Sequence, residues 1–255
     1  MAIEEDVIVI GGGLAGSIAA LEAADSDATV RLITHKKSTL RHASGLIDVL
    51  GYLDEEEPVA DPFSAISELP DDHPYSIAGE AAVRDGLARF DEAVGDMYQG
   101  SHTDNNALLP TFGGAVKPTA RYPTAAAAGL ASDSREMLVV GFEELTEYNA
   151  NMLADHLERA DVPFDVDGVE LNFPGEYAND SRVTRFAKRL DNNEDVEHDG
   201  QTMGAREALA DSIKPHLGDA ERVGLPAFLG DEHAAEVRSD LERDLGVDVF
   251  EIPMG

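Results

Sequence analysis

The stretch "DVIVIGGGLAGSIAALEAA", residues 6–24, is the part of the chain from which its architecture can be inferred. It begins with a short run of mostly β-branched apolar residues, which is typical of a buried parallel strand. Three glycines follow, and from Leu14 onward the residues are strong helix formers with apolar positions on nearly every face. After a polar loop, "ATVRLIT" at residues 28–34 predicts a second strand. The sequence therefore predicts a βαβ unit of about 30 residues.

Glycines in this unit match the GxGxxG pattern at the point where the first strand meets the helix. Gly11 permits the tight turn, Gly13 leaves room for the backbone to approach a phosphate, and Gly16 lets the helix lie close to the strand. The amides of the first helical turn, which includes Leu14 and Ala15, would stabilise the anion together with the helix dipole. The pattern predicts nucleotide or flavin binding at these residues. The alternative is that the glycines serve only the turn and the packing.

The end of the second strand lacks a residue that is usual in dinucleotide-binding proteins. An acidic side chain commonly stands there and accepts the ribose hydroxyls of FAD or NAD. This chain has Thr34 and His35, followed by Lys36 and Lys37. Three interpretations stay open: the lysines meet a 2′-phosphate, the cofactor has no adenosine, as in FMN, or "THKK" is only a solvated loop.

Composition excludes several classes of protein. None of the apolar segments of this 255-residue chain approaches the roughly 18 to 20 residues that span a bilayer. The chain has no cysteine, so it cannot itself supply disulfides, thiolate metal sites or iron–sulfur ligands. Its 51 acidic and 19 basic residues give a net charge of −32, which disfavours binding to nucleic acid or to an anionic membrane. Because the acidic residues are spread along the chain, we expect a folded protein adapted to concentrated salt, which screens the repulsion.

The rest of the chain reads as a mixed helix and strand protein. We expect a loop with a short helix over residues 35–74, and beyond it the elements listed by range: a helix at 77–98, strands at 136–142, 167–174 and 247–253, and helices at 148–159, 180–190, 204–216 and 231–245. The predicted fold class is α/β, a Rossmann-like FAD/NAD(P)-binding fold with an α+β second lobe. We expect a flavin- or dinucleotide-binding lobe at 1–115 and a second, incomplete α/β lobe that serves as cap or interface at 116–255.

Six segments together resemble one known family, and they extend along nearly the whole chain. They are "VIVIGGGLAG" (7–16), "ASGLIDVLGYL" (43–53), "DPFSAI" (61–66), "HPYSIAG" (73–79), "LLPTFGGAVKPTARYPTAAAAGL" (108–130) and "MLVVGFEEL" (137–145). This combination is similar to the B subunit of anaerobic glycerol-3-phosphate dehydrogenases, in a form like that of haloarchaea. The family continues beyond the closing "EIPMG", so the resemblance also implies a C-terminally shortened member.

The resemblance implies a cofactor and partners. Members are flavoproteins, with FMN favoured and FAD the other option, and they work with a catalytic, FAD-containing A subunit and an iron–sulfur C subunit. The complex oxidises sn-glycerol 3-phosphate to dihydroxyacetone phosphate and passes electrons toward quinone. The resemblance implies a cytoplasmic protein that reaches the membrane only through its partners. It also implies that Ser44 and Gly45 pass near the isoalloxazine ring.

Other residues give weaker signals. Lys117 and Arg121, in a glycine-rich loop, either clamp a phosphate or pair with surface carboxylates. Asp48 either caps a helix, which we favour, or contacts the flavin. The histidines lack the spacing of metal ligands, and no catalytic acid or base can be singled out. Two alternative functions stay open: a flavin-free scaffold protein of the same complex, and an independent FAD- or NADP-dependent oxidoreductase.

Overall fold

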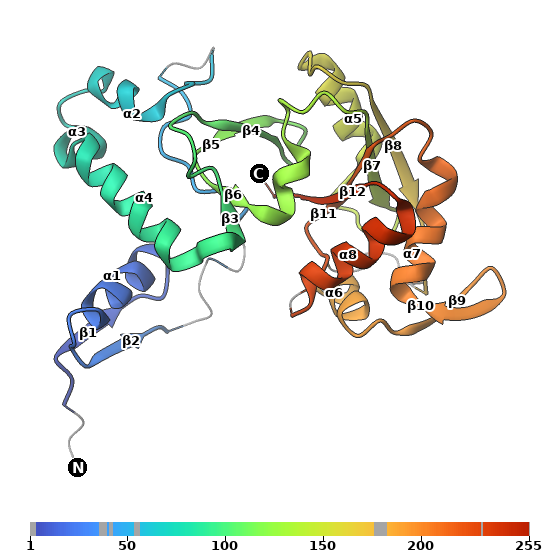
Figure 1. Cartoon of the computed structure of the whole chain (residues 1–255), viewed down its shortest axis with the longest axis horizontal. Helices are drawn as coiled ribbons and strands as arrows, with labels where there is room; N and C mark the ends of the chain where they lie inside the picture. The colour runs from blue at the N-terminus through green and yellow to red at the C-terminus, as the bar shows by residue number, and fades with distance from the viewer. Residues whose placement is uncertain are drawn as a thin grey trace.

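The computed structural model describes residues 4–35, 40, 43–53, 57–175, 183–230 and 232–254. Figure 1 shows two lobes side by side, with the N-terminal βαβ unit extending from the far end of the first. No helix in these ranges is long and apolar enough to cross a membrane. The predicted α/β class is confirmed.

The βαβ unit forms as predicted. β1 (Val7–Ile10) and β2 (Val30–Ile33) are parallel and in register from end to end, and α1 (Leu14–Ala24) connects them. Asp6 fixes the start of this register, since its carboxylate accepts hydrogen bonds from the Thr29 amide at 2.9 Å and the Thr29 hydroxyl at 2.7 Å. The two strands form a sheet of their own among the described residues.

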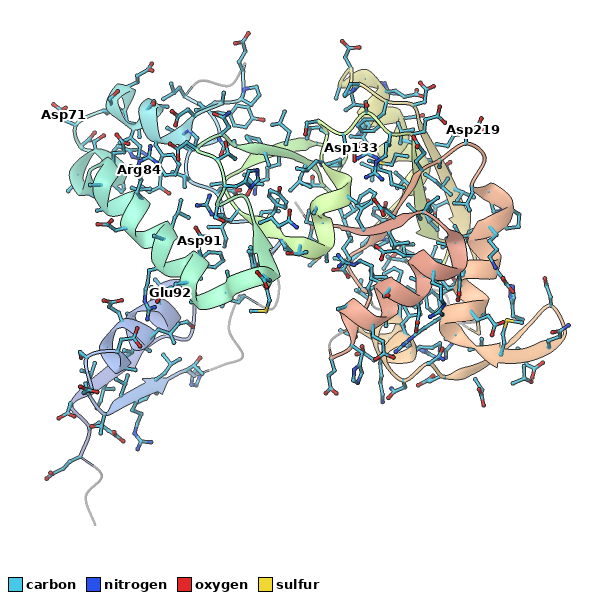
Figure 2. All side chains as sticks on the ribbon, viewed as in Figure 1. Asp71, Arg84, Asp91, Glu92, Asp133 and Asp219 are labelled. Carbon is cyan, nitrogen blue, oxygen red and sulfur yellow. The ribbon has the colours of Figure 1, made fainter. Side chains whose placement is uncertain are left out.

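The βαβ unit is joined to the rest of the first lobe partly by ion pairs. Arg89 contacts Glu22 at 3.0 Å and also pairs with Asp25, and both acidic residues belong to α1 or its C-terminal cap. Figure 2 shows Glu92, another partner of Arg89, at the end of α4 (Glu80–Val94) that lies next to α1. No residue of α1, which is described along its full length, is buried. The packing that the apolar composition of α1 predicts is therefore incomplete.

Short helices and hairpins make up the rest of the first lobe. Its elements are α2 (Pro62–Ala65), η2 (Ile66–Glu68), α3 (Pro74–Ala78), α4, η3 (Gly95–Met97), β3 (Tyr98–Gln99), β4 (Ala107–Pro110), β5 (Val116–Thr119), β6 (Tyr122–Pro123) and η4 (Thr124–Gly129). β4 pairs with β5 and β3 with β6, both antiparallel.

One prediction for the first lobe was wrong in detail. The single helix expected at residues 77–98 is divided at Gly79, whose φ of +82° belongs to the left-handed region and ends α3 before α4 begins. The loop with a short helix expected over residues 35–74 agrees with the described residues of that range, since α2 lies within it. Residues 43–53 form isolated bridges, Ile47 with Arg121 and Tyr52 with Pro58.

The second lobe is built on a four-stranded parallel sheet with the order β12-β11-β7-β8. The strands are β7 (Met137–Phe142), β8 (Val166–Leu171), β11 (Arg222–Pro226) and β12 (Asp248–Ile252). The other elements are α5 (Ala150–Arg159), α6 (Val183–Asp191), β9 (Asp195–His198), β10 (Gln201–Gly204), α7 (Ala205–Ile213), η5 (Lys214–His216) and α8 (Ala234–Leu245). Because all four strands of this sheet are parallel and helices connect them, the lobe is α/β, which corrects the α+β description.

The largest hydrophobic core lies in the second lobe. β7 and β11 are buried along their whole length, and helices α5, α7 and α8 contribute fully buried leucines to the same cluster. The first lobe contains only small clusters, such as the one formed by Phe63, Leu87 and Ala120. The packed centre of the molecule is therefore distant in sequence from the glycine motif.

The expected boundary between residues 115 and 116 falls in the turn of the β4–β5 hairpin. Since the two strands of a hairpin bond to each other along their length, a boundary there would divide one structural unit. We propose instead that the lobes separate after η4, near residue 130. The buried guanidinium of Arg222 holds this connection by donating to the carbonyl oxygens of Ala128, Leu130 and Asp133 at 2.8–3.0 Å.

Candidate functional site

The glycine motif forms an open cradle at the N-terminus of α1. Gly11 has a φ of +116°, and its N–H donates to the carbonyl oxygen of Ile33 at 2.8 Å, which fixes the turn to the end of β2. Gly13 caps the helix in an extended conformation, and no side chain in the described part of the chain caps the first amides of α1. A Cβ atom at Gly13 would meet nothing within 4 Å. Because these amides carry the positive end of the helix dipole, the cradle can accept an anion.

Gly16 has a different physical role from Gly13. A side chain at Gly16 would overlap the carbonyl oxygen of Gly11 and would lie 3.6 Å from Val9. The helix therefore lies directly on the turn only because this residue has no Cβ. Leu14 and Ala15 are exposed in the same first turn, so their amides lie at the open end of the helix.

The end of β2 borders the cradle. The Thr34 side chain lies against Gly12, where an added Cβ would be 3.2 Å from that of Thr34. His35 is exposed beyond it. Lys36 and Lys37, the proposed partners of a 2′-phosphate, lie outside the described residues. Neither Thr34 nor His35 carries a carboxylate for a ribose.

Gly45 lies against the β3–β6 pair. The Ser44 hydroxyl accepts a hydrogen bond from the Leu46 amide at 3.2 Å, and a Cβ at Gly45 would be 3.1 Å from Pro123. Residues 47–49, which follow closely in the chain, line the same groove as Leu14 of α1. The structure thus brings the "ASGLID" segment to the glycine motif through residues 47–49.

This groove has a volume of about 440 Å³ and is mainly apolar. It lies between α1, residues 47–49, α3 and α4. Its lining consists of Leu14, Ile18, Ile47, Asp48, Val49, Pro74, Tyr75, Ala78, Ala82, Val83, Gly86, Leu87 and Phe90. Ligand pockets are commonly apolar clefts of roughly 300–1,000 Å³ with a few polar groups, so the groove has the size and character to hold a ring system.

Sequence reasoning did not identify the groove residues of α3 and α4 as part of a site. The spacing of Val83, Leu87 and Phe90 predicted a helix with a buried face, and only Leu87 and Phe90 are in fact buried. One sequence feature could have indicated the groove: two small residues, Ala82 and Gly86, are exposed on the same helix. They leave space that a larger side chain would fill.

Two roles were open for Lys117 and Arg121, a phosphate clamp or pairing with carboxylates, and the structure shows the pairing. Lys117 pairs with Asp48 at 2.7 Å at the edge of the groove. The helix-capping role favoured for Asp48 is wrong, because no helix begins within residues 43–53. Arg121 is buried, donates to both oxygens of Asp91 at 2.7 and 2.9 Å, and also bonds to the carbonyl oxygens of Gly100 and Ala120. All of its nitrogens are therefore engaged within the first lobe.

The second lobe has a topological switch point between β7 and β11, where ligands bind in many open α/β sheets. Here side chains of the protein fill it. Phe142 is the last residue of β7, and Phe228 follows the end of β11. Their ring centres lie 5.5 Å apart, and both rings pack with Phe173 and Phe186. The nearby N-terminus of α5 is likewise occupied, since Glu170 accepts a hydrogen bond from the Ala150 amide at 2.5 Å.

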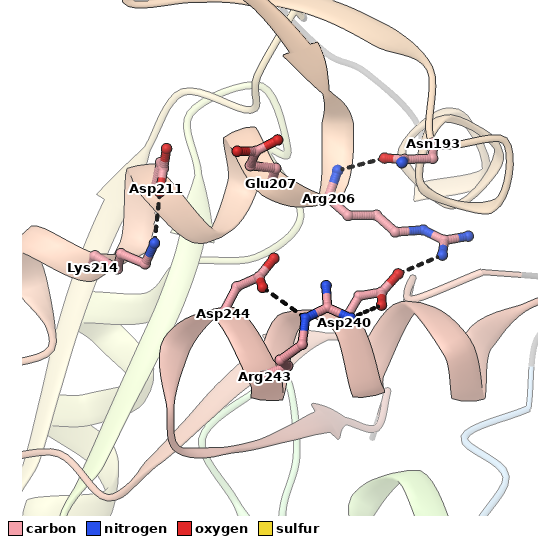
Figure 3. Close-up of a pocket in the computed structure, with 8 residues that line it drawn as sticks. All are labelled: Asn193, Arg206, Glu207, Asp211, Lys214, Asp240, Arg243 and Asp244. Atoms are coloured by element: carbon pink, nitrogen blue, oxygen red, sulfur yellow. Dashed lines mark hydrogen bonds and ion pairs between the residues drawn. The ribbon is translucent and has the colours of Figure 1, made fainter.

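A second cavity, between α7 and α8, contains charged residues that pair with one another. Figure 3 shows Arg206 and Arg243 both directed at Asp240, at 2.8 and 2.6 Å, and Lys214 directed at Asp211. Arg206 and Arg243 lower the pKa of Asp240. Burial opposes charge on Arg206, but its contacts with Asp240 and Glu236 leave its pKa raised, and contacts with Asp244 and Asp240 raise the pKa of Arg243. The cations are thus committed to internal carboxylates. No group of three or more possible metal ligands occurs within the described ranges.

Comparisons with known proteins show the family to which the chain belongs. Residues 6–255 match the FAD binding domain family. A Halobacterium salinarum protein, named as the probable B subunit of an anaerobic glycerol-3-phosphate dehydrogenase, is 57% identical over the whole chain. Proteins named as the B subunit of the same dehydrogenase from Yersinia pestis and Actinobacillus pleuropneumoniae are 29% and 24% identical over 90% and 97% of the chain.

The chain spans only part of the length of these relatives: 60% of the Halobacterium salinarum protein, 55% of the Yersinia pestis protein and 59% of the Actinobacillus pleuropneumoniae protein. No solved structure matches it.

Proposed function

We propose that this chain, which belongs to the FAD-binding domain family, binds a flavin whose phosphate lies in the Gly11–Gly16 cradle and whose ring system lies in the adjoining apolar groove. The observation that carries the proposal is the open space at Gly13 beside amides that no side chain of the described residues caps. A purely structural glycine turn would have no need of that space. Leu14 links the two parts, because it belongs to the first turn of α1 and lines the groove.

Of the two common flavins, we favour FMN. Thr34 and His35 offer no carboxylate to the ribose of an adenosine, and FMN has no adenosine. The description of the family favours FAD instead. Release of the cofactor by denaturation, followed by its mass, distinguishes the two, and recovery of FAD would overturn the FMN assignment.

We further propose that the protein is an electron-carrying component of an anaerobic glycerol-3-phosphate dehydrogenase complex, with electrons passing toward quinone. The names of the relatives support the role of one component within a complex. The partners would be a catalytic, FAD-containing A subunit and an iron–sulfur C subunit, since this chain has no cysteine to ligate a cluster. Contact with the membrane would come through those partners.

A bound flavin supplies the redox chemistry, and the protein supplies position and access. The α1 amides would hold the phosphate, Gly16 keeps those amides against the turn, and Val83, Leu87 and Phe90 give the groove an apolar wall. Asp48 and Lys117 place an ion pair at its rim. The described cations near the groove are paired with carboxylates, so we place oxidation of the glycerol phosphate in the catalytic partner.

The Gly13→Val variant tests the proposal. Gly13 has an ordinary negative φ of −83° and free space around it, so valine should leave the fold intact while its methyl groups block the approach of a phosphate. We expect at least about a tenfold loss of flavin affinity, measured by the visible absorbance and fluorescence titration of the purified protein in concentrated KCl.

Gly113→Val is the matched control, because a Cβ at Gly113 also meets nothing within 4 Å and the residue lies outside the groove. Flavin binding by Gly13→Val equal to that of the control would refute the cradle. Failure of the wild-type protein to bind either flavin would favour the flavin-free scaffold. Binding of NADP would favour an independent oxidoreductase that uses Lys36 and Lys37.

A further inference from the structure

A carboxylate stands in the wall of the apolar groove. Among the described residues that line the groove, Asp48 alone carries a charge. A charge beside an apolar surface is costly unless it is paired, because little water remains there to solvate it. Lys117 supplies the pairing: its Nζ lies 2.7 Å from Asp48 Oδ2, and the two side chains are 35% and 36% exposed. The groove therefore has a compensated pair of charges in its wall.

The backbone fixes the position of this pair. Lys117 lies on β5, which is paired with β4. The segment that carries Asp48 is bound to the chain just beyond β5, because the Ile47 amide donates to the carbonyl oxygen of Arg121 at 2.9 Å. The Ile47 carbonyl oxygen in turn accepts a hydrogen bond from the Ala120 amide at 3.0 Å. Both charges are thus carried by backbone that is held in place beside the groove.

The pair has a definite direction relative to the groove. Asp48 lines the groove, whereas Lys117 does not and meets it through the Asp48 carboxylate. A group in the groove therefore meets the negative end of the pair first. A negative charge disfavours a second negative charge nearby, and a positive charge favours it. Removal of either partner would leave the other charge uncompensated, with opposite effects on an anion in the groove.

We propose that Asp48 and Lys117 set the reduction potential of the flavin in the groove. Addition of two electrons and one proton to the oxidised flavin leaves one negative charge on its ring, and protein charges near the ring determine how readily it forms. With its negative end toward the groove, the pair keeps this potential lower than an uncharged wall would, and Lys117 limits the effect of the carboxylate. The electrons come from the flavin of the catalytic partner, and dithionite supplies them in vitro. This inference rests on the proposed flavin site.

Two substitutions that remove one charge each test the proposal. In Asp48→Asn the lysine is uncompensated, so the ratio of the affinities for reduced and oxidised FMN should rise at least about tenfold, which is about 30 mV in a two-electron potential. In Lys117→Met the carboxylate is uncompensated, so the same ratio should fall at least about tenfold. Lys117→Arg keeps the charge and should keep the wild-type ratio.

The potential of the bound flavin gives this ratio. It is measured by visible absorbance during anaerobic reduction in equilibrium with a reference dye, in concentrated KCl, with free FMN as the reference and with FAD in a parallel series. Concentrated salt screens a partly buried pair less than it screens exposed charges. A variant that does not fold, as judged by circular dichroism, leaves the other two as the test.

Asp211→Asn and Lys214→Met are the matched controls. Lys214 pairs with Asp211 at 2.8 Å at similar exposure, and both line the charged cavity of the second lobe. These variants change the net charge equally, but should leave the ratio within about twofold of the wild type, since charges beyond a Debye length are screened.

Three results would overturn the proposal while the flavin site stands: ratios equal to that of the wild type in both groove variants, shifts of the two in the same direction, or shifts of equal size in the controls. A role of the pair in folding alone would weaken the binding of both oxidation states equally and leave the ratio unchanged. Failure of the wild type to bind flavin in either oxidation state would overturn the proposed function together with this inference.

Discussion

At the scale of single residues, the same residue type has opposite roles at nearby positions of the chain. Gly13 keeps space free for a ligand, whereas Gly16 allows the helix to contact the turn. Two arginines likewise have different roles. Arg243 is an exposed partner of Asp240 and Asp244, but Arg222 is completely buried and serves the backbone.

Arg222 is expected to be essential for the connection between the lobes. Its guanidinium donates to four carbonyl oxygens, including that of Arg135, and stacks 4.3 Å from the Phe164 ring. Burial lowers the pKa of Arg222 to about 10, so the group stays charged at neutral pH. We expect Arg222→Met to lower the free energy of unfolding by about 3 kcal/mol, since it removes the guanidinium donors from these four carbonyls.

Urea unfolding in concentrated KCl measures this loss. Arg243→Met is the control, because exposed surface ion pairs contribute little to stability. If both substitutions lowered the free energy of unfolding by the same amount, the buried contacts of Arg222 would stabilise the protein no more than the surface ion pairs of Arg243.

Glu251 is expected to make stability depend on pH. Its carboxylate accepts a hydrogen bond from the Leu229 amide at 2.8 Å, and burial raises its pKa. Because the pKa is higher in the folded state, the folded protein binds more protons than the unfolded one between the two values, and raising the pH through this range lowers stability. Glu251→Gln keeps an acceptor for the amide and should be more stable than wild type at neutral pH.

The difference in free energy of unfolding between Glu251→Gln and wild type should shrink as the pH falls toward the pKa of Glu251 in the unfolded state. The wild-type carboxyl then becomes neutral. Urea unfolding across this pH range measures it, with Glu147→Gln, at an exposed position, as the control for loss of one charge. An advantage that does not change with pH would contradict the assignment to the Glu251 carboxyl.

At the scale of elements, α4 does more than its helical pattern predicts. It forms one wall of the groove, and through Arg89 it also holds α1. Figure 2 shows Arg84 and Asp91 along this helix, and both connect it to the rest of the lobe: Arg84 lies over the Phe63 ring and Asp91 binds Arg121. Loss of α4 order should therefore disturb the groove and the position of the cradle together.

Gly86 in the middle of α4 is expected to cost stability. A Cβ at this position would meet nothing within 4 Å, and alanine is favoured over glycine in a helix interior. Gly86→Ala should raise the free energy of unfolding by about 0.5–1 kcal/mol, measured by urea unfolding.

Gly79→Ala provides the contrast on the same helix, because its φ of +82° strains any residue with a Cβ. It should be destabilising. If Gly86→Ala did not raise the free energy of unfolding, we would infer that another group packs against this wall of the groove and leaves no room for the added methyl group.

At the scale of the whole molecule, charge and core are distributed differently. The net charge of −32 is spread over the surface, with Asp71 and Asp219 pointing outward at the edges of the two lobes in Figure 2. The main core is confined to the second lobe, and the βαβ unit has exposed isoleucines. Repulsion between carboxylates should therefore affect the first lobe most, since less apolar burial opposes it there.

Salt should stabilise the protein strongly. The Debye length falls from about 10 Å at ~0.1 M to about 3 Å at ~1 M, so concentrated KCl screens most surface repulsion. We expect the melting temperature to rise by the order of 10 °C between these concentrations, measured by calorimetry. Sucrose at equal osmolality is the control for general exclusion effects, and an equal rise in sucrose would contradict a screening mechanism.

The sequence by itself determined the local features. The β-branched run, the three glycines and the alanine-rich helix set the βαβ unit because strand preference, turn geometry and helix preference all act over a few residues, and "EMLVVGF" identified β7 for the same reason. The glycine cradle was predictable on the same basis.

Only the tertiary structure decided which distant groups meet. The groove joins α1 to helices that come about 50 residues or more later in the chain, Lys117 and Arg121 turn to Asp48 and Asp91, and phenylalanines fill the switch point of the second lobe. Such choices depend on which surfaces and charges come together after the chain has collapsed, and no short stretch of sequence contains that information.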